Sequence, residues 1–593
     1  MRHISLLFLL SSLLTGCARL LPTPSATASN GEAAFARLAD EYIAGYLACR
    51  PQAGTALGLH EYDGKVTDFS QSSLEAELAR LKSFARRMAE LDTKSLSPRS
   101  SRDYRLLCGA IQREIFAFDD LRVYWQNPMT YAGVLDVSIY IKRDFAPLEA
   151  RVRAITEILK QSPRLVAAAR TNLAESLPRP QVETAIEQAN GTADFLGKEL
   201  VAALQSMTNE TLMAEFKAAN RRAMEAMRGY ATYLQEQKLP KANDRYALGR
   251  EKYVRLLEYG EMVTLSPEQL LELGQRELQR LQRAFGEAAR TIAPETKPIE
   301  VFQAIQKDHP TEQNLIADTA KDLELIRRFV VEHRIITLPS PIRARVEETP
   351  QFLRATSMAF MDTPGPFETR ATEAYYYVTP VEADWPPRQK EEWLTAFNYY
   401  TTDIVSIHEA YPGHYAQFLC LNASSATRLE KIFNSYAFTE GWAHYTEQML
   451  VDEGFGQSAS PAPTSAELIR AAKFRLAQAD EALLRACRLC VSIKMHCQGM
   501  NVDQATRFFQ DNCYYEPKPA RQEAVRGTFD PEYLYYTLGK LEILKLREDY
   551  RQQEGAKFTL QGFHDEMLRY GAPPIRLLRE AMLRNPRSWS EVL

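Results

Sequence analysis

Apolar residues recur at intervals of three and four along nearly the whole chain from about residue 33. Leu74, Leu78, Leu81, Phe84 and Met88 follow this spacing within one early segment, and charged residues fill much of the opposite face. Such a period is typical of amphipathic α-helices that bury one face. Capping signals at residues 266–269 and 464–467 mark two helix starts. The pattern predicts a mainly α fold with a large multi-helix body.

One stretch departs from the helical pattern. Between residues 334 and 384 six prolines recur, and β-type runs occupy residues 342–346 and 375–378. This composition predicts a small β-hairpin or sheet inserted in the helical body. The three tyrosines at 375–377 suggest either a strand that lines a cleft and pairs with an extended peptide, or a half-buried hairpin. The sequence leaves both interpretations open.

The composition excludes several classes of protein. The 593 residues are 45% hydrophobic and 25% charged, as in ordinary globular proteins. Lys and Arg number 72 against 76 Asp and Glu. The chain therefore lacks the excess of basic residues that would indicate a nucleic-acid partner.

A provisional division falls at about residue 260, between an N-terminal helical half (33–260) and a C-terminal catalytic half (261–593). One continuous domain is the alternative, and the oligomeric state is left open.

The first residues form a different kind of sequence. Arg2 and His3 precede an apolar run at residues 4–14, which is too short to span a bilayer. Residues 14–17 (Leu-Thr-Gly-Cys) resemble a bacterial lipoprotein signal, so that residues 1–16 are removed and Cys17 is lipidated. Residues 17–32 are rich in Pro, Ser, Thr and Ala, which is typical of a flexible tether. We expect a lipid-anchored envelope protein, on the outer membrane and facing the periplasm; an ordinary secretory signal is the alternative.

Seven cysteines follow Cys17, and their pairing cannot be read from the sequence. Cys487 and Cys490 have the Cys-x-x-Cys spacing that can indicate redox or zinc chemistry. Their flanks are strongly helical and no second such pair occurs, so we favour two core residues on one helix face.

Histidines concentrate in one short region. Three of the nine fall within 37 residues, in the company of three glutamates: His408, His414, His444, Glu409, Glu440 and Glu447. A zinc hydrolase needs two or three imidazole or carboxylate ligands, an open position for water, and a carboxylate beside it as general base. Buried structural polar residues are the alternative explanation for this cluster.

His408 and His414 lie six residues apart, which an unbroken helix cannot reconcile with a shared metal. They would point about 240° apart and lie about 9 Å apart along the axis. Pro412 clashes with the carbonyl four residues back, and Gly413 tolerates nearly any backbone conformation. We therefore expect the helix to kink, bulge or stop here, which could return His414 to the face of His408.

Other residues near the two histidines are candidates for the remaining roles in a zinc hydrolase. Glu440 is the natural third ligand, on a second helix that begins near residue 437, and Glu409 is the candidate base. His444, one turn after Glu440, is placed to hydrogen-bond a ligand or substrate. His496 and Tyr536 are candidates for stabilising an oxyanion or binding a substrate carboxylate. Lys540 and Arg526 add positive charge nearby in the sequence.

The chain resembles the bacterial domain of unknown function (DUF) 885 family over nearly its whole mature length. The resemblance is carried by residues 408–414 (His-Glu-Ala-Tyr-Pro-Gly-His), 440–443 (Glu-Gly-Trp-Ala) and 536–540 (Tyr-x-x-Gly-Lys). That family is similar to gluzincin metallopeptidases, which have helical bodies around a deep cleft. The resemblance implies His408, His414 and Glu440 as ligands and Glu409 as catalytic base. The family usually has an acidic residue where this chain has Ser492.

The expected function is that of a zinc-dependent peptide hydrolase of the bacterial envelope, with one Zn²⁺ ion and short peptides as substrates. Water on the zinc would be activated by Glu409. A non-catalytic peptide- or metal-binding lipoprotein is the alternative, although it has no evident need for a base beside the ligands.

Overall fold

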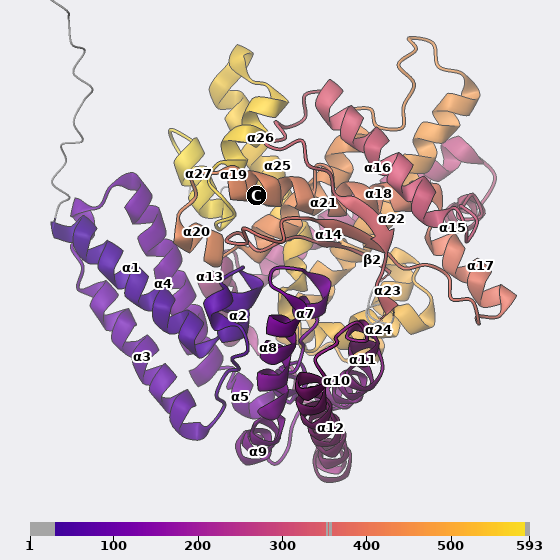
Figure 1. Cartoon of the computed structure of the whole chain (residues 1–593). Helices are drawn as coiled ribbons and strands as arrows, with labels where there is room; N and C mark the ends of the chain where they lie inside the picture. Colours follow the sequence, from indigo (N-terminus) through magenta and orange to yellow (C-terminus); the bar gives the residue numbers. More distant parts are fainter. Residues whose placement is uncertain (1–29, 352–353, 355–357, 587–593) are drawn as a thin grey trace, which may run out of the picture.

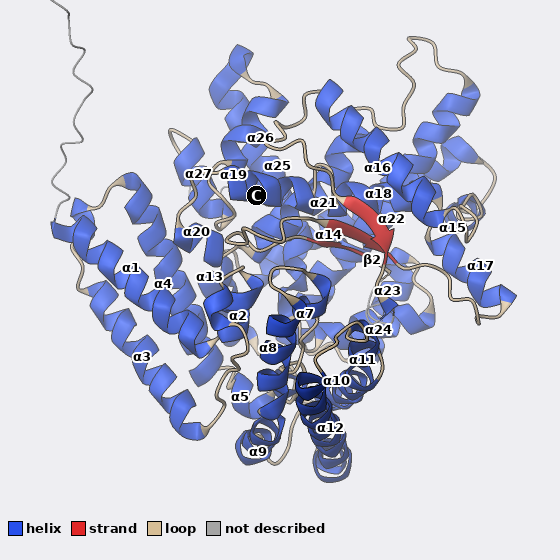
Figure 2. Ribbon diagram, in the orientation of Figure 1, coloured by secondary structure: helices blue, strands red, loops and turns tan. Residues whose placement is uncertain are grey.

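The computed structural model describes residues 30–351, 354 and 358–586, and most of these residues are helical (Figures 1 and 2). The mainly α prediction is confirmed. The first half contains α1 (Asn30–Cys49), α2 (Pro51–Ala56), α3 (Gln71–Ala89), α4 (Pro98–Asp119), α5 (Val123–Gln126), α6 (Met129–Ala132), α7 (Ile139–Lys142), α8 (Leu148–Lys160), α9 (Ser162–Asn172), α10 (Arg179–Gly197), α11 (Glu199–Ala203) and α12 (Glu210–Tyr233).

The second half contains a small sheet among further helices (Figure 2). Its helices are α13 (Arg250–Glu261), α14 (Pro267–Ile292), α15 (Pro298–Ile305), α16 (Leu315–Glu332), α17 (Pro387–Ala396), α18 (Tyr399–Glu409), α19 (His414–Ala423), α20 (Arg428–Ile432), α21 (Tyr436–Asp452), α22 (Ser465–Cys497), α23 (Val502–Cys513), α24 (Pro517–Gly527), α25 (Tyr535–Glu554), α26 (Leu560–Leu568) and α27 (Ile575–Met582). No described helix combines the length and the apolar character that crossing a bilayer requires.

Two clusters of buried apolar side chains stabilise the fold. One draws almost entirely on residues 35–234, and the other on residues 246–583. They change over between Leu234 and Tyr246, somewhat before the division expected at about 260. Helix α1 already begins at Asn30, inside the expected tether, while Cys17 and the signal segment lie outside the described residues.

The sheet lies within residues 334–384, as the prolines and β-type runs predict. Its strand order is β1 (Arg345–Glu348), β3 (Tyr375–Val378), β2 (Ala359–Asp362). Strand β3 pairs in parallel with β1 and antiparallel with β2. The strand of three tyrosines is therefore central, and both of its edges are already paired. A peptide therefore cannot pair with it, and β1 and β2 are the edge strands of the sheet.

Helix α22 is a long central helix of the second core. Its start at Thr464 and the start of α14 at Ser266 both form the predicted capping boxes. Cys487 and Cys490 are buried on it, and every cysteine in the described part of the chain is a free thiol. The favoured assignment of these two cysteines to the core is confirmed.

Two glycines let helices α21 and α25 approach until their backbones touch. A Cβ on Gly441 would lie 2.5 Å from the carbonyl carbon of Gly539, and a Cβ on Gly539 would overlap the carbonyl oxygen of Ala437. Only glycine permits so close a crossing. The crossing brings the turn of α25 that carries Tyr536 and Lys540 against the turn of α21 that carries Glu440.

We expect Gly539→Ala to lower the free energy of unfolding by about 1–3 kcal/mol, because the added methyl must push two helix backbones apart. Denaturant unfolding followed by circular dichroism measures this loss. Gly191→Ala is the matched control: Gly191 is exposed in α10, and nothing lies within 4 Å of its Cβ position. The control should be neutral or slightly stabilising. Equal stability of the two variants would contradict the close crossing.

Candidate metal centre

The helical segment that carries the histidine motif is interrupted between its two histidines. Helix α18 ends at Glu409 and α19 begins at His414, so the predicted interruption is confirmed. The backbone N–H of Gly413 donates to the carbonyl of Ile407 over 3.0 Å, which folds the chain back tightly. A Cβ on Gly413 would overlap the carbonyl group of His408. The indole N–H of Trp442 donates to the Pro412 carbonyl over 2.9 Å and fixes the turn against α21.

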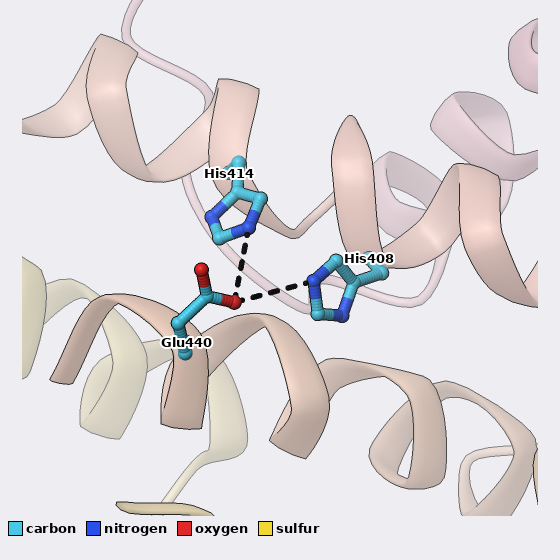
Figure 3. Close-up of side chains that lie close together, drawn as sticks. All are labelled: His408, His414 and Glu440. Atoms are coloured by element: carbon cyan, nitrogen blue, oxygen red, sulfur yellow. Dashed lines mark ion pairs between the residues drawn. The ribbon is translucent and has the colours of Figure 1, made fainter. Parts of the chain in front are cut away.

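The turn brings His414 back beside His408, and α21 adds Glu440 (Figure 3). The Nε2 atoms of both histidines lie 3.5 Å from the same carboxylate oxygen, Oε2 of Glu440. One ligand atom from each of the three residues lies within 4.8 Å of the other two. Two imidazole nitrogens and a carboxylate oxygen that face one point could hold a single metal ion.

The carboxylate of Glu440 has an oxygen without a hydrogen-bond donor in the described part of the chain, which also suits a metal ion. Oε2 of Glu440 is buried and has no hydrogen-bond partner in the described part of the chain. His408 is buried, whereas the side chains of His414 and Glu440 are 13% and 19% exposed, so the cluster opens to solvent on one side. A bound cation would give this buried oxygen, which faces two imidazoles, the partner that it lacks.

Electrostatics favour positive charge at this point. Burial alone would lower the pKa of His408, but its interactions with the carboxylates of Glu440 and Glu447 outweigh burial and raise the pKa to about 10. Burial would raise the pKa of Glu440, but His414 and His408 hold it well below its usual range. The carboxylates therefore attract a cation into the site.

Glu447 orients His408 from behind. Nδ1 of His408 donates to Oε1 of Glu447 over 2.6 Å, which leaves Nε2 free to face the metal position. His444 contacts the other oxygen of Glu447 at 3.0 Å, and Arg485 lies 3.5 Å from this carboxylate. Glu447 thus links His444 to His408, and within the described part of the chain no hydrogen bond joins His444 to Glu440. Glu447 belongs to the histidine and glutamate cluster in the sequence, but no role could be assigned to it there. Its place two turns after Glu440, on the same helix face, was the available signal.

We expect Glu447→Gln to weaken zinc binding about 10–100-fold, because the amide loses the charge that holds His408 in its ligand orientation. Competition with a chromophoric chelator measures the affinity. Glu453→Gln, an exposed change at the end of the same helix, is the control and should bind zinc like the parent protein. Unchanged affinity in Glu447→Gln would refute the orienting role.

Glu409 lies next to His408 at the last position of α18. Its Oε2 accepts a hydrogen bond from the backbone N–H of Met361, in β2, over 3.0 Å. The carboxylate is half-buried. The edge of β2 therefore holds the candidate base beside a candidate ligand histidine, through a contact between segments distant in the sequence.

His496 is fully engaged by the backbone. Its Nδ1 accepts from the N–H of Leu248 over 3.3 Å, and its Nε2 donates to the carbonyl of Gly527 over 2.8 Å. Burial lowers its pKa to about 4. His496 consequently has no free donor to offer a substrate, and its predicted catalytic role finds no support in these contacts.

Tyr536 lies beside the cluster. Arg485 and Arg488 flank its ring, with their Cζ atoms 5.7 and 5.2 Å from the ring centroid. Burial raises its pKa, and the negative charge of Glu440 raises it further. Lys540, one turn later, is buried and forms a 2.7 Å ion pair with Glu277, so its charge is already neutralised.

Comparisons with known proteins agree with this architecture. A family model described as "Bacterial protein of unknown function (DUF885)" matches residues 51–582. A proposed lipoprotein of unknown function from Shewanella oneidensis has a similar structure, with a TM-score of 0.76 and 24% identity, over 93% of this chain and 100% of that one. A proposed lipoprotein from Colwellia psychrerythraea gives a TM-score of 0.74 and 18% identity, over 92% and 98%. No curated protein matches the chain.

Proposed function

We propose that the chain, which belongs to the bacterial DUF885 family, is a zinc-dependent peptide hydrolase anchored to the cell envelope. The observation that carries the proposal is the convergence of His408, His414 and Glu440 on one point, with Glu409 directly beside His408. Catalytic zinc sites characteristically have three such protein ligands and keep one position open. The solvent-exposed side of the cluster supports an open position here.

Zinc fits this donor set better than a hard cation does, because two of the three ligand atoms are imidazole nitrogens. A bound zinc ion would polarise a peptide carbonyl and make water easier to deprotonate. The protein must then supply a base, a donor for the carbonyl oxygen and a means of holding the peptide.

Glu409 is the proposed base. Its carboxylate accepts a proton from the attacking water as the water oxygen bonds to the carbonyl carbon. It then passes that proton to the amine nitrogen as the carbon–nitrogen bond breaks. Its hydrogen bond from Met361 keeps it aimed while leaving the other oxygen to take the proton. Tyr536, whose hydroxyl forms no hydrogen bond with another described residue, is the proposed donor to the carbonyl oxygen.

The proposed substrates are short, extended peptides. The ligand side chains are exposed by less than a fifth, so a folded protein surface cannot reach them, whereas an extended chain can. The envelope anchor rests on Cys17 and its preceding Leu-Thr-Gly, and on the two similar structures described as proposed lipoproteins. Attachment to the outer membrane, facing the periplasm, is part of the proposal.

The test uses the lipidated protein purified in detergent and a mixture of short peptides followed by mass spectrometry. We expect cleavage by the zinc-loaded protein, loss of cleavage on chelation, and recovery on adding zinc. Cleavage that survives complete metal removal would overturn the proposal. Tight peptide binding without cleavage by the zinc-loaded protein would instead favour a non-catalytic peptide-binding lipoprotein.

A further inference from the structure

A tyrosine and an arginine lie along the ligand helix from the metal centre. Tyr436 is the first residue of α21, one turn before Glu440, so both side chains lie on the same helix face. Arg526, in the last turn of α24, approaches it, with Nη2 3.5 Å from the Tyr436 hydroxyl oxygen. Neither residue takes part in the metal cluster or in the proposed proton transfer.

Both groups have donors left over. Arg526 contacts Asp530 through Nε at 2.9 Å and Nη2 at 2.8 Å, and Nη1 has no hydrogen-bond partner among the described residues. The Tyr436 oxygen is the acceptor toward Arg526, so its own O–H remains to donate. The Tyr536 ring lies 5.8 Å from the Tyr436 ring. Donors thus converge here, and Asp530, the carboxylate that Arg526 contacts, is already paired.

These donors lie close to the metal ligands and can be reached from solvent. Burial raises the pKa of Tyr436, and neighbouring negative groups that include Glu440 raise it further. The side chain of Arg526 is 32% exposed, and that of Asp530 is 24% exposed. A second guanidinium, that of Arg488, lies 5.2 Å from the Tyr536 ring and is paired with Glu523. Several side chains with hydrogen-bond donors, those of Tyr436, Arg526 and Arg488, therefore lie on this side of the metal cluster.

We propose that Arg526 and Tyr436 bind the free carboxyl terminus of the peptide, so that the enzyme removes residues from carboxyl ends. A planar guanidinium and a phenol hydroxyl that lie 3.5 Å apart suit a carboxylate, with hydrogen bonds strengthened by charge. This inference rests on the proposed function and specifies its substrate. A side-chain carboxylate has the same chemistry, and the test separates the two sources.

The test measures binding and does not depend on turnover. Zinc-loaded protein is equilibrated with randomised N-acetylated tetrapeptides, prepared as free acids or as C-terminal amides, and retained peptides are identified by mass spectrometry after ultrafiltration. We expect retention of the free acids over the amides. Arg526→Gln should weaken acid binding about 10–100-fold, the loss of one charged hydrogen bond, and leave amide binding unchanged. Tyr436→Phe should weaken it by less.

Two controls separate this effect from loss of structure or of charge. Arg521→Gln removes a charge from the same helix at a side chain that is 59% exposed and paired with Asp503, so it should bind like the parent protein. Arg526→Lys keeps the charge but not the fork, and should recover part of the affinity. Equal retention of acids and amides, or an Arg526→Gln variant indistinguishable from Arg521→Gln, would overturn the assignment.

Retention of amides that contain Asp or Glu, in preference to other amides, would also overturn the terminal assignment and move the contact to a side-chain carboxylate. Failure of the proposed function looks different. In that case no peptide is cleaved with or without zinc, whereas cleavage of acids and amides at equal rates would remove only the carboxylate subsite.

Discussion

Glu409→Gln should slow peptide hydrolysis about 10²–10⁴-fold while the protein keeps one zinc per chain. Glutamine matches glutamate in shape, and its carbonyl oxygen can still accept the hydrogen bond from Met361 N–H. The variant loses only the capacity to take a proton from water. Initial rates on a cleaved peptide and elemental analysis of the same preparation measure both quantities.

The matched control is Glu300→Gln, which removes a carboxylate that is 52% exposed on α15. It should hydrolyse peptides at the parent rate. A Glu409→Gln protein that retains zinc and full activity would eliminate Glu409 as the base. Loss of zinc together with activity would mean that Glu409 acts on the metal site and not on the water.

Gly413→Ala should have the largest effect on the site itself. The added methyl would overlap the His408 carbonyl group, so the turn must open and carry His414 away from His408. A displacement of about 1 Å is enough to cost about 100-fold in activity. The variant should also lose about 1–3 kcal/mol of stability. Peptide hydrolysis, zinc affinity and denaturant unfolding all report on this change.

Gly133→Ala is its control, since Gly133 is exposed, has a negative φ and has nothing within 4 Å of its Cβ position. Zinc affinity, activity and stability should stay near the parent values. If Gly413→Ala binds zinc as tightly as this control, the tight turn is not what unites the two histidines.

The local parts of the fold could be predicted from sequence because they depend on residues close in the chain. The capping boxes at Ser266 and Thr464 and the proline-rich insertion with its sheet were all visible in the pattern. The position of β3 at the sheet centre was not, because strand order depends on contacts between segments distant in the sequence. The deep cleft implied by the family resemblance stays a prediction.

The site likewise contains features that could be predicted from the sequence and features that could not. Pro412 and Gly413 predicted a break in the helix between the two histidines, because backbone sterics act locally. Met361, Glu447 and Tyr436 were missed because each acts through a contact from another strand or turn. His496 shows the reverse case: a histidine near a family motif becomes a backbone-bonded core residue once Leu248 and Gly527 are packed against it.

The most direct test of the account is a crystal structure of the zinc-loaded protein, with anomalous diffraction recorded at the zinc edge. We expect one anomalous peak, about 2.0–2.2 Å from Nε2 of His408, Nε2 of His414 and a carboxylate oxygen of Glu440. A zinc peak elsewhere, or no peak at these three residues after equilibration with zinc, would contradict it.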